Sequence, residues 1–363
     1  MKPEETLQRA LISTTSRFVG EYSGDDFEIT HASPPFGVMR ARVFEGPTSR
    51  NAFMLSFRTE PWNRDSVIVP DYTYIGDMFC DYLSLLFGKR FDNHGLIESL
   101  GNFRVPDLSP YSTFCDHQLP HNSHSPREDF GLSSDLKEVS RLRCFSQPMC
   151  WPDSFRNHFE VANRFYGRAL RNWERDPEGA YLHLVSAIEV ASHVVDFDHD
   201  QLLDNEARQM LLKLQKIHEA HGSAQDDCMA VETFLRSRLK QVKRSFVETV
   251  LMHLDDGFYL TAEDGTTLGC FTPETIRQNV AAAYDLRSRY LHRGERFGSY
   301  VTTAWAGRGE IPIGRLQAED AEFSRIVSRS PTIAGMERLV RYVLLNLGAR
   351  NGGVVLNDES HDA

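Results

Sequence analysis

The stretch DSFRNHFEVANRFYGRALRNW, residues 153–173, marks the point where the periodicity of the chain changes. Its apolar residues step by four and three positions and form one stripe, made of Phe155, Phe159, Ala162, Tyr166, Ala169 and Trp173. A stripe of this period predicts an amphipathic helix that buries one face. Helical periodicity then continues downstream, so we predict that the second part of the chain is all α-helical.

Further helices are predicted after this one from start signals, stop signals and apolar stripes. Asp176 followed by Pro177 indicates a helix start. The carboxylate accepts hydrogen bonds from the first backbone amides of a helix, which have no partner within it, and proline has no backbone N–H that would need such a partner. Thr272 and Pro273 start another helix that ends toward Gly294, a residue suited to a C-terminal cap. A loop-rich segment is expected at about residues 295–331. The remaining apolar stripes cover residues 180–195, 203–217, 231–250 and 336–347.

The first part of the chain has a different pattern. From Arg17 to about Pro70, short apolar runs at residues 36–44 and 52–57 alternate with proline-containing turns, which predicts a small β-rich unit. Residues 74–87 carry apolar side chains at spacings of three and four, which predicts one helix.

The predicted fold class is α+β, with a β-rich domain followed by a larger helical bundle. A stretch rich in Pro, Ser, His and Asn, residues 101–134, is expected to be a long loop or linker between them. We therefore divide the chain into a β-rich domain with one helix and this linker (1–135), a helical domain (150–350) and a flexible tail (351–363).

The composition is that of a globular protein outside the membrane. A formal net charge of -11 argues against a surface that grips nucleic acid everywhere, so any RNA contact must be local. Residues 1–18 lack the apolar run of a secretory signal and no stretch is long enough to span a bilayer, so we expect a cytoplasmic protein. Its six cysteines form no CxxC pair and are expected to be buried or free thiols.

The predicted helix before Gly294 ends in YDLRSRYLHRG, residues 284–294. The pattern Tyr-x-x-Arg-Ser-x-x-x-His with a nearby Gly resembles the signature of Apea-like HEPN domains. Flanking stretches at residues 164–169, 187–189 and 339–344 resemble other helices of that family, and the resemblance covers roughly residues 154–349. One departure is Arg293, which stands where the family usually has Gly directly after the His, and which shifts the helix cap by one residue.

The residues of this motif favour RNA cleavage without a metal. Such cleavage needs a base, an acid and a fixed cation for the phosphate. Histidine titrates near neutrality and an arginine fork grips phosphate oxygens, so His292 and Arg287 supply these roles. Five residues at about 100° each place them roughly 140° apart on an ideal helix, so two copies must contribute or the last turn must distort. The resemblance implies a two-fold dimer with two Arg and two His in one cleft.

Other residues near the motif have predicted supporting roles. Ser288 is included among the catalytic candidates, because it lies one turn before His292 and can orient the imidazole, although it equally serves only as a filler. Glu189 either pairs with Arg287 or serves the site as a carboxylate, or it is a solvated residue one turn before His193. Tyr284 is a further candidate for support.

Several charged residues have an alternative, structural interpretation. Arg289 and Arg293 are predicted to contact RNA, while the spacing of Asp285 and Arg289 predicts a surface ion pair. An Arg and a His at a helix C-terminus also interact well with the helix dipole and need no function there. The basic stretch at residues 236–244 either tracks an RNA backbone or is a solvated helix face.

A rival metal site lies in the predicted linker, where Cys115, His117, His121 and His124 fall within ten residues. Their spacing matches no zinc pattern, so we expect no metal and no cofactor. The leading hypothesis is a metal-independent endoribonuclease with RNA as substrate and a homodimeric site. The resemblance also implies a defence or stress role, with the N-terminal region meeting a trigger or regulatory partner. The alternative is a non-catalytic HEPN dimer that binds RNA, a nucleotide or a partner protein.

Overall fold

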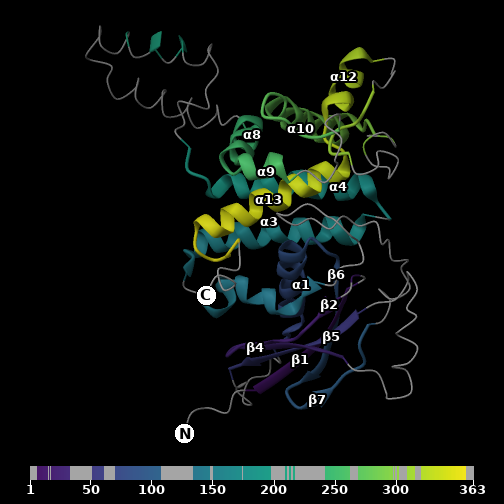
Figure 1. The fold of residues 1–363 in the computed structure, drawn as a ribbon, viewed down its shortest axis with the longest axis vertical. Coiled ribbons are helices and arrows are strands. Elements are labelled where there is room, and N and C mark those ends of the chain that lie inside the picture. Colours follow the sequence, from purple (N-terminus) through teal and green to yellow (C-terminus); the bar gives the residue numbers. More distant parts are fainter. Residues whose placement is uncertain are drawn as a thin grey trace.

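The computed structural model describes a β-sheet and a helical bundle that pack against each other (Figure 1). The described residues are 6–14, 16, 18–32, 51–60, 70–107, 134–147, 150–173, 175–197, 209–210, 212–213, 216, 242–261, 269–296, 298, 301, 309–314 and 320–356. The fold class is α+β, as the sequence predicts.

The N-terminal part contains a six-stranded sheet in the order β3-β4-β5-β1-β6-β7, whose strand pairs are all antiparallel. The strand β1 lies in its middle and pairs with β5 from Thr6 opposite Thr59 to Thr14 opposite Asn51. A separate parallel pair joins β2 to β8. The strands are β1 (Thr6–Thr14), β2 (Phe18–Val19), β3 (Tyr22–Ser23), β4 (Phe27–His31), β5 (Asn51–Thr59), β6 (Phe91–Ser99), β7 (Asn102–Phe103) and β8 (Ser134–Asp135).

The apolar run that predicts a strand at residues 52–57 lies in β5. The helix predicted at residues 74–87 is α1 (Thr73–Phe87). The run at residues 36–44 lies outside the described residues. The sequence pattern missed β1 and β6, because polar side chains on their buried positions break the apolar alternation. Two of those side chains pair inside the sheet: Ser13 Oγ lies 2.7 Å from His94 Nε2.

Several helices of the second part begin and end as their sequence signals predict. Asp176 accepts from the Gly179 amide at 2.9 Å and caps α4. Gly294 has φ +67° and ends α10. The described helices are α2 (Arg143–Ser146), α3 (Asp153–Asn172), α4 (Pro177–Ala191), α8 (Val242–Met252), α9 (Asp256–Leu260), α10 (Ile276–Arg293), α12 (Ala321–Arg329) and α13 (Ile333–Arg350), with short 3-10 turns at Leu136–Arg141 and Ser192–Val194.

Two details differ from the sequence predictions, and a third prediction lies largely outside the described residues. The helix expected from Thr272 begins at Ile276, because residues 273–275 form a turn first. The segment expected to be loop-rich contains α12, which the Asp320 side chain caps by accepting from two amides. Of the helices predicted at 203–217 and 231–250, the structure describes α8 and a few isolated positions; the rest lies outside the described residues.

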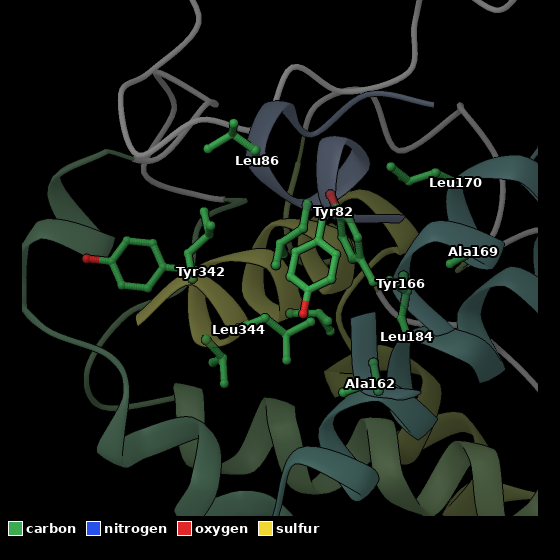
Figure 2. Close-up of a cluster of buried hydrophobic side chains, with 14 of the residues drawn as sticks. Tyr82, Leu86, Ala162, Tyr166, Ala169, Leu170, Leu184, Tyr342 and Leu344 are labelled. Carbon is green, nitrogen blue, oxygen red and sulfur yellow. The ribbon is translucent and has the colours of Figure 1, made fainter. Parts of the chain in front are cut away.

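The helix α13 is the centre of the core. Its residues from Met336 to Gly348 are all buried, and it packs against α3, α4 and α8 and contacts α1. Figure 2 shows Tyr82, Tyr166, Leu184 and Leu344 in one cluster, so α1, α3, α4 and α13 share their interior. The last predicted helix is therefore confirmed, and it is the most enclosed one of the described chain.

Two arginines, the buried Arg341 and the half-buried Arg171, join the N-terminal part to the bundle. Arg341 of α13 donates from Nε to the Leu85 carbonyl at 2.7 Å and from Nη2 to the Leu86 carbonyl, at the C-terminal end of α1. Arg171 of α3 donates to Asp81 of α1 at 2.7 Å. The last carbonyls of a helix have no partner within it, so Arg341 satisfies groups that burial would otherwise leave unpaired.

We predict that Arg341→Met destabilises the protein by about 2–5 kcal/mol, because it leaves two buried carbonyls without a donor. The free energy of unfolding from urea titration measures the change. The matched control is Arg350→Met on the exposed last turn of the same helix, which should cost less than about 0.5 kcal/mol. Equal losses in the two variants would contradict this role of Arg341.

Candidate functional site

The predicted site lies at the C-terminal half of α10, which packs against α8 and also contacts α4 (Figure 1). The helix is regular up to Arg293, and the Gly294 amide donates to the Tyr290 carbonyl at 3.0 Å. The cap therefore lies at Gly294, directly after Arg293. The last turn does not distort, so Arg287 and His292 point to different sides of one helix.

Arg287 is held by a carboxylate from the neighbouring helix α4. Its Nη2 lies 3.0 Å from Glu189 Oε2, and the two side chains are only 22% and 15% exposed. This confirms the predicted pairing of Glu189 with Arg287 across the bundle. Burial raises the pKa of Glu189, and the guanidinium opposes this shift. Arg287 Nε is buried and has no hydrogen-bond partner among the described residues.

Tyr284 lies one turn before Arg287 on the same helix. The Arg287 Cζ atom is 6.0 Å from the centre of its ring, which packs at 5.5 Å against the ring of Phe246 from α8. Burial raises the pKa of Tyr284, and the nearby Glu189 carboxylate adds to this rise. The phenol therefore stays protonated at neutral pH and forms a wall beside the ion pair. Phe246 was missed as a site residue because in the sequence it is one more apolar position of a helix.

His292 lies in the last turn of α10 and is exposed, as are its neighbours Leu291 and Arg293. Ser288 is half-buried, and no hydrogen bond of the described residues joins it to His292. Within one chain the structure therefore brings together Arg287, Glu189 and Tyr284, and leaves His292 outside this group.

Arg289 has a different environment from the other arginines of the motif. Its side chain is 8% exposed and pairs with Glu295 and Asp320, each at 2.8 Å, and with Glu322. These contacts fix α10 to α12. The expected Asp285–Arg289 pair is wrong, because Asp285 accepts instead from Lys243 of α8 at 2.6 Å.

Arg293 remains largely exposed. Its side chain is 60% exposed and its nearest carboxylate, Glu295, is 3.8 Å away. The basic stretch at residues 236–244 lies mostly outside the described residues, as does the group of Cys115, His117, His121 and His124. No cluster of three or more potential metal ligands occurs in the part of the chain that the structure describes. Cys80, Cys144, Cys150 and Cys270 are free thiols, as expected.

Comparison with known proteins adds no assignment: no family model, no curated protein and no solved structure matches this chain. Among the described helices, none has the length and apolar character needed to cross a membrane.

We predict a coupling of about 1–2 kcal/mol between Glu189 and Arg287, since an ion pair this enclosed is screened less than a surface pair. A double-mutant cycle of Glu189→Gln and Arg287→Met, read by urea unfolding, measures it. The more exposed pair Glu248–Arg277 on α8 and α10 is the matched control and should couple by less than about 0.5 kcal/mol. A coupling near zero at Glu189–Arg287 would contradict the inference.

Proposed function

We propose that this protein is a metal-independent endoribonuclease whose site forms where the α10 helices of two copies meet. The observation that carries the proposal is the regular end of α10, on which Glu189 holds Arg287 while His292 is exposed in the last turn. A fixed cation and an accessible imidazole at one helix end are the groups that cleavage at a phosphodiester needs.

The reaction uses the 2'-hydroxyl of the substrate as nucleophile. His292 of one copy takes the proton of this hydroxyl as its oxygen attacks phosphorus, and His292 of the second copy gives a proton to the departing 5'-oxygen. Arg287 stabilises the charge that builds up on the phosphoryl oxygens. The products are a 2',3'-cyclic phosphate and a 5'-hydroxyl end, so DNA is not a substrate.

Two observations support the participation of a second copy. Arg287 and His292 lie on different sides of a regular helix, so one chain does not present both to one phosphate. Leu291, directly before His292, is 52% exposed, and an apolar side chain at this position favours contact with another protein surface. Both support a contact between copies at the end of α10.

The arginines of the motif divide into two roles in this proposal. Arg293 is exposed and suited to an RNA phosphate, whereas three carboxylates already engage Arg289. Arg289 then acts by fixing α10. Ser288 has no hydrogen bond to His292 among the described residues, so its role is proposed only for the state with RNA bound.

The second candidate function is a non-catalytic dimer that binds RNA, a nucleotide or a partner protein. The Glu189–Arg287 pair favours it in one respect, because a carboxylate at 3.0 Å partly neutralises the cation that a phosphate needs. A nuclease requires Arg287 to present donors to phosphate while Glu189 occupies one edge of the fork. The Nε group is buried, so these donors are the Nη groups of a side chain that is 22% exposed.

We predict that the purified protein cleaves single-stranded RNA in the presence of a chelator and leaves cyclic phosphate ends. His292→Ala should lower the rate by about a hundredfold to ten-thousandfold, as loss of a proton-transfer group does. The Arg287→Lys protein should also be unable to cleave RNA, because an ammonium group does not hold two phosphate oxygens as the guanidinium fork does. Arg277→Lys on the exposed start of the same helix is the control and should keep full activity. Robust cleavage by folded His292→Ala protein would reject the site.

Mixing two inactive variants tests whether the site is shared between copies. A heterodimer of Arg287→Lys and His292→Ala chains retains one intact Arg287 and one intact His292, on different copies. This heterodimer keeps one of the two His292 side chains that the reaction uses, so mixing and re-annealing the variants should give a rate above that of the His292→Ala dimer and well below that of the wild type. No recovery, with heterodimers verified by native mass spectrometry, would show that each copy needs both residues.

A further inference from the structure

A cavity of about 310 Å³ lies on the N-terminal side of the molecule, between the sheet, α1, α2 and α3. Its wall is mainly aromatic, with Phe27, Phe57, Phe79, Tyr82, Phe145 and Trp151 from five different segments. This volume is at the lower end of the range for small-molecule sites, so it suits a ligand of one or two rings. The cavity is separate from the α10 site, because α3 and α4 lie between them (Figure 1).

The rings of the wall are ordered among themselves. Phe79 and Phe145 stack with centroids 4.4 Å apart, and Phe27 meets Phe79 edge-on at 4.7 Å. Tyr82 meets Phe145 edge-on at 4.8 Å. Flat faces and edges at these spacings accept a further planar ring in a stacked or edge-on position.

Two polar groups on this wall lack partners among the described residues. The Tyr82 side chain is only 3% exposed, and its hydroxyl makes no hydrogen bond with the described residues. The hydroxyl oxygen is nevertheless not completely enclosed by protein atoms. The charges nearest its hydroxyl include Glu160 and Arg156, which line the same cavity. The hydroxyl therefore faces the cavity. A hydroxyl buried to this degree costs free energy unless something hydrogen-bonds to it.

Glu160 is the second group. It is half-buried, and although it stands four residues after Arg156 on α3, the two do not form an ion pair. Arg156 instead donates to the Trp151 carbonyl at 3.3 Å and lies 4.0 Å from Asp153. Burial raises the pKa of Glu160. A hydrogen-bond acceptor, the Glu160 carboxyl, and a donor, the Tyr82 hydroxyl, thus line the same cavity.

The thiol of Cys144, which also lines the cavity, is not reactive. Burial raises the pKa of the Cys144 thiol to about 12, so at neutral pH it is neither a nucleophile nor a metal-binding thiolate. Charged side chains of both signs line the cavity, Asp26 and Glu160 on one hand and Arg58 and Arg156 on the other, and next to Glu160 a second carboxylate is disfavoured. The ligand therefore places a donor and not a carboxylate at Glu160, and it is held without a covalent bond.

We propose that this cavity binds one small planar heterocycle whose edge both donates and accepts hydrogen bonds, the N–H going to Glu160 and the acceptor to Tyr82. Lactam-type edges of this kind occur in nucleobases and in pterins. Stacking against Phe145 supplies the apolar part of the binding, and the two polar groups select the edge.

Isothermal titration calorimetry with guanosine, pterin, indole and benzoate tests the proposal and distinguishes the two sources. At least one of guanosine and pterin should bind with one ligand per chain, and the one that binds names the source. Indole has no acceptor and should bind at least about tenfold more weakly, since one lost hydrogen bond is worth about 1 kcal/mol or more when its partner stays buried. Benzoate should not bind.

Conservative variants then locate the binding. Tyr82→Phe removes a neutral hydrogen bond and should weaken binding by about three- to tenfold. Glu160→Gln removes a charged hydrogen bond and should weaken binding by about ten- to a hundredfold. Tyr259→Phe on α9 is the matched control and should bind as the wild type. Melting curves check that all three variants are folded.

Two results would overturn the proposal. One is that neither heterocycle binds, or that indole binds as tightly as they do. The other is that folded Tyr82→Phe and Glu160→Gln proteins bind with unchanged affinity. The titration contains no RNA and should give the same result with His292→Ala protein, so its failure leaves the nuclease proposal untouched, and the reverse also holds.

Discussion

The burial of α13 on all sides is the constraint on which the rest of the structure depends. A helix in this position must have partners for every polar side chain it carries, because unpaired buried groups cost several kcal/mol. Arg341 finds them at the end of α1, while Arg338 pairs with Glu310 and lies 4.0 Å over the Phe258 ring. Tyr166 of α3 donates to Glu337. The polar residues of α13 thus fix the positions of α1, α3 and α9 as firmly as its leucines do.

The candidate site uses this rigid frame. Glu189 belongs to α4, which packs against both α3 and α13, so the carboxylate that meets Arg287 has a fixed backbone. On the other side, Arg289 ties α10 to α12 through three carboxylates. Two arginines separated by one residue on the same helix therefore differ: Arg289 is enclosed by three carboxylates, whereas Arg287 pairs with one and has a buried Nε without a partner among the described residues.

The sequence predicts the elements whose pattern is strong and local. The stripe of α3, the Asp176 cap of α4 and the Gly294 cap of α10 all follow from residues within one or two turns. The strands β1 and β6 do not, because their buried Gln8, Ser13 and His94 become acceptable only through partners from other strands. At the site, Glu189 was expected to reach Arg287 as one of several alternatives. The partners of Arg289 on α12 lie about thirty residues away in a segment without a clear period, so local spacing misassigned it to Asp285.

The position of α13 in the chain has a consequence for how the protein is made. Arg341 bonds to a carbonyl 256 residues earlier, and the whole bundle packs on a helix near the C-terminal end of the described chain. During synthesis the sheet and α1 emerge long before this helix, and contacts of such sequence separation form slowly. The nascent chain therefore exposes the apolar faces of α1, α3 and α4 until α13 has been made. The frame that holds Glu189 of α4 is complete only then.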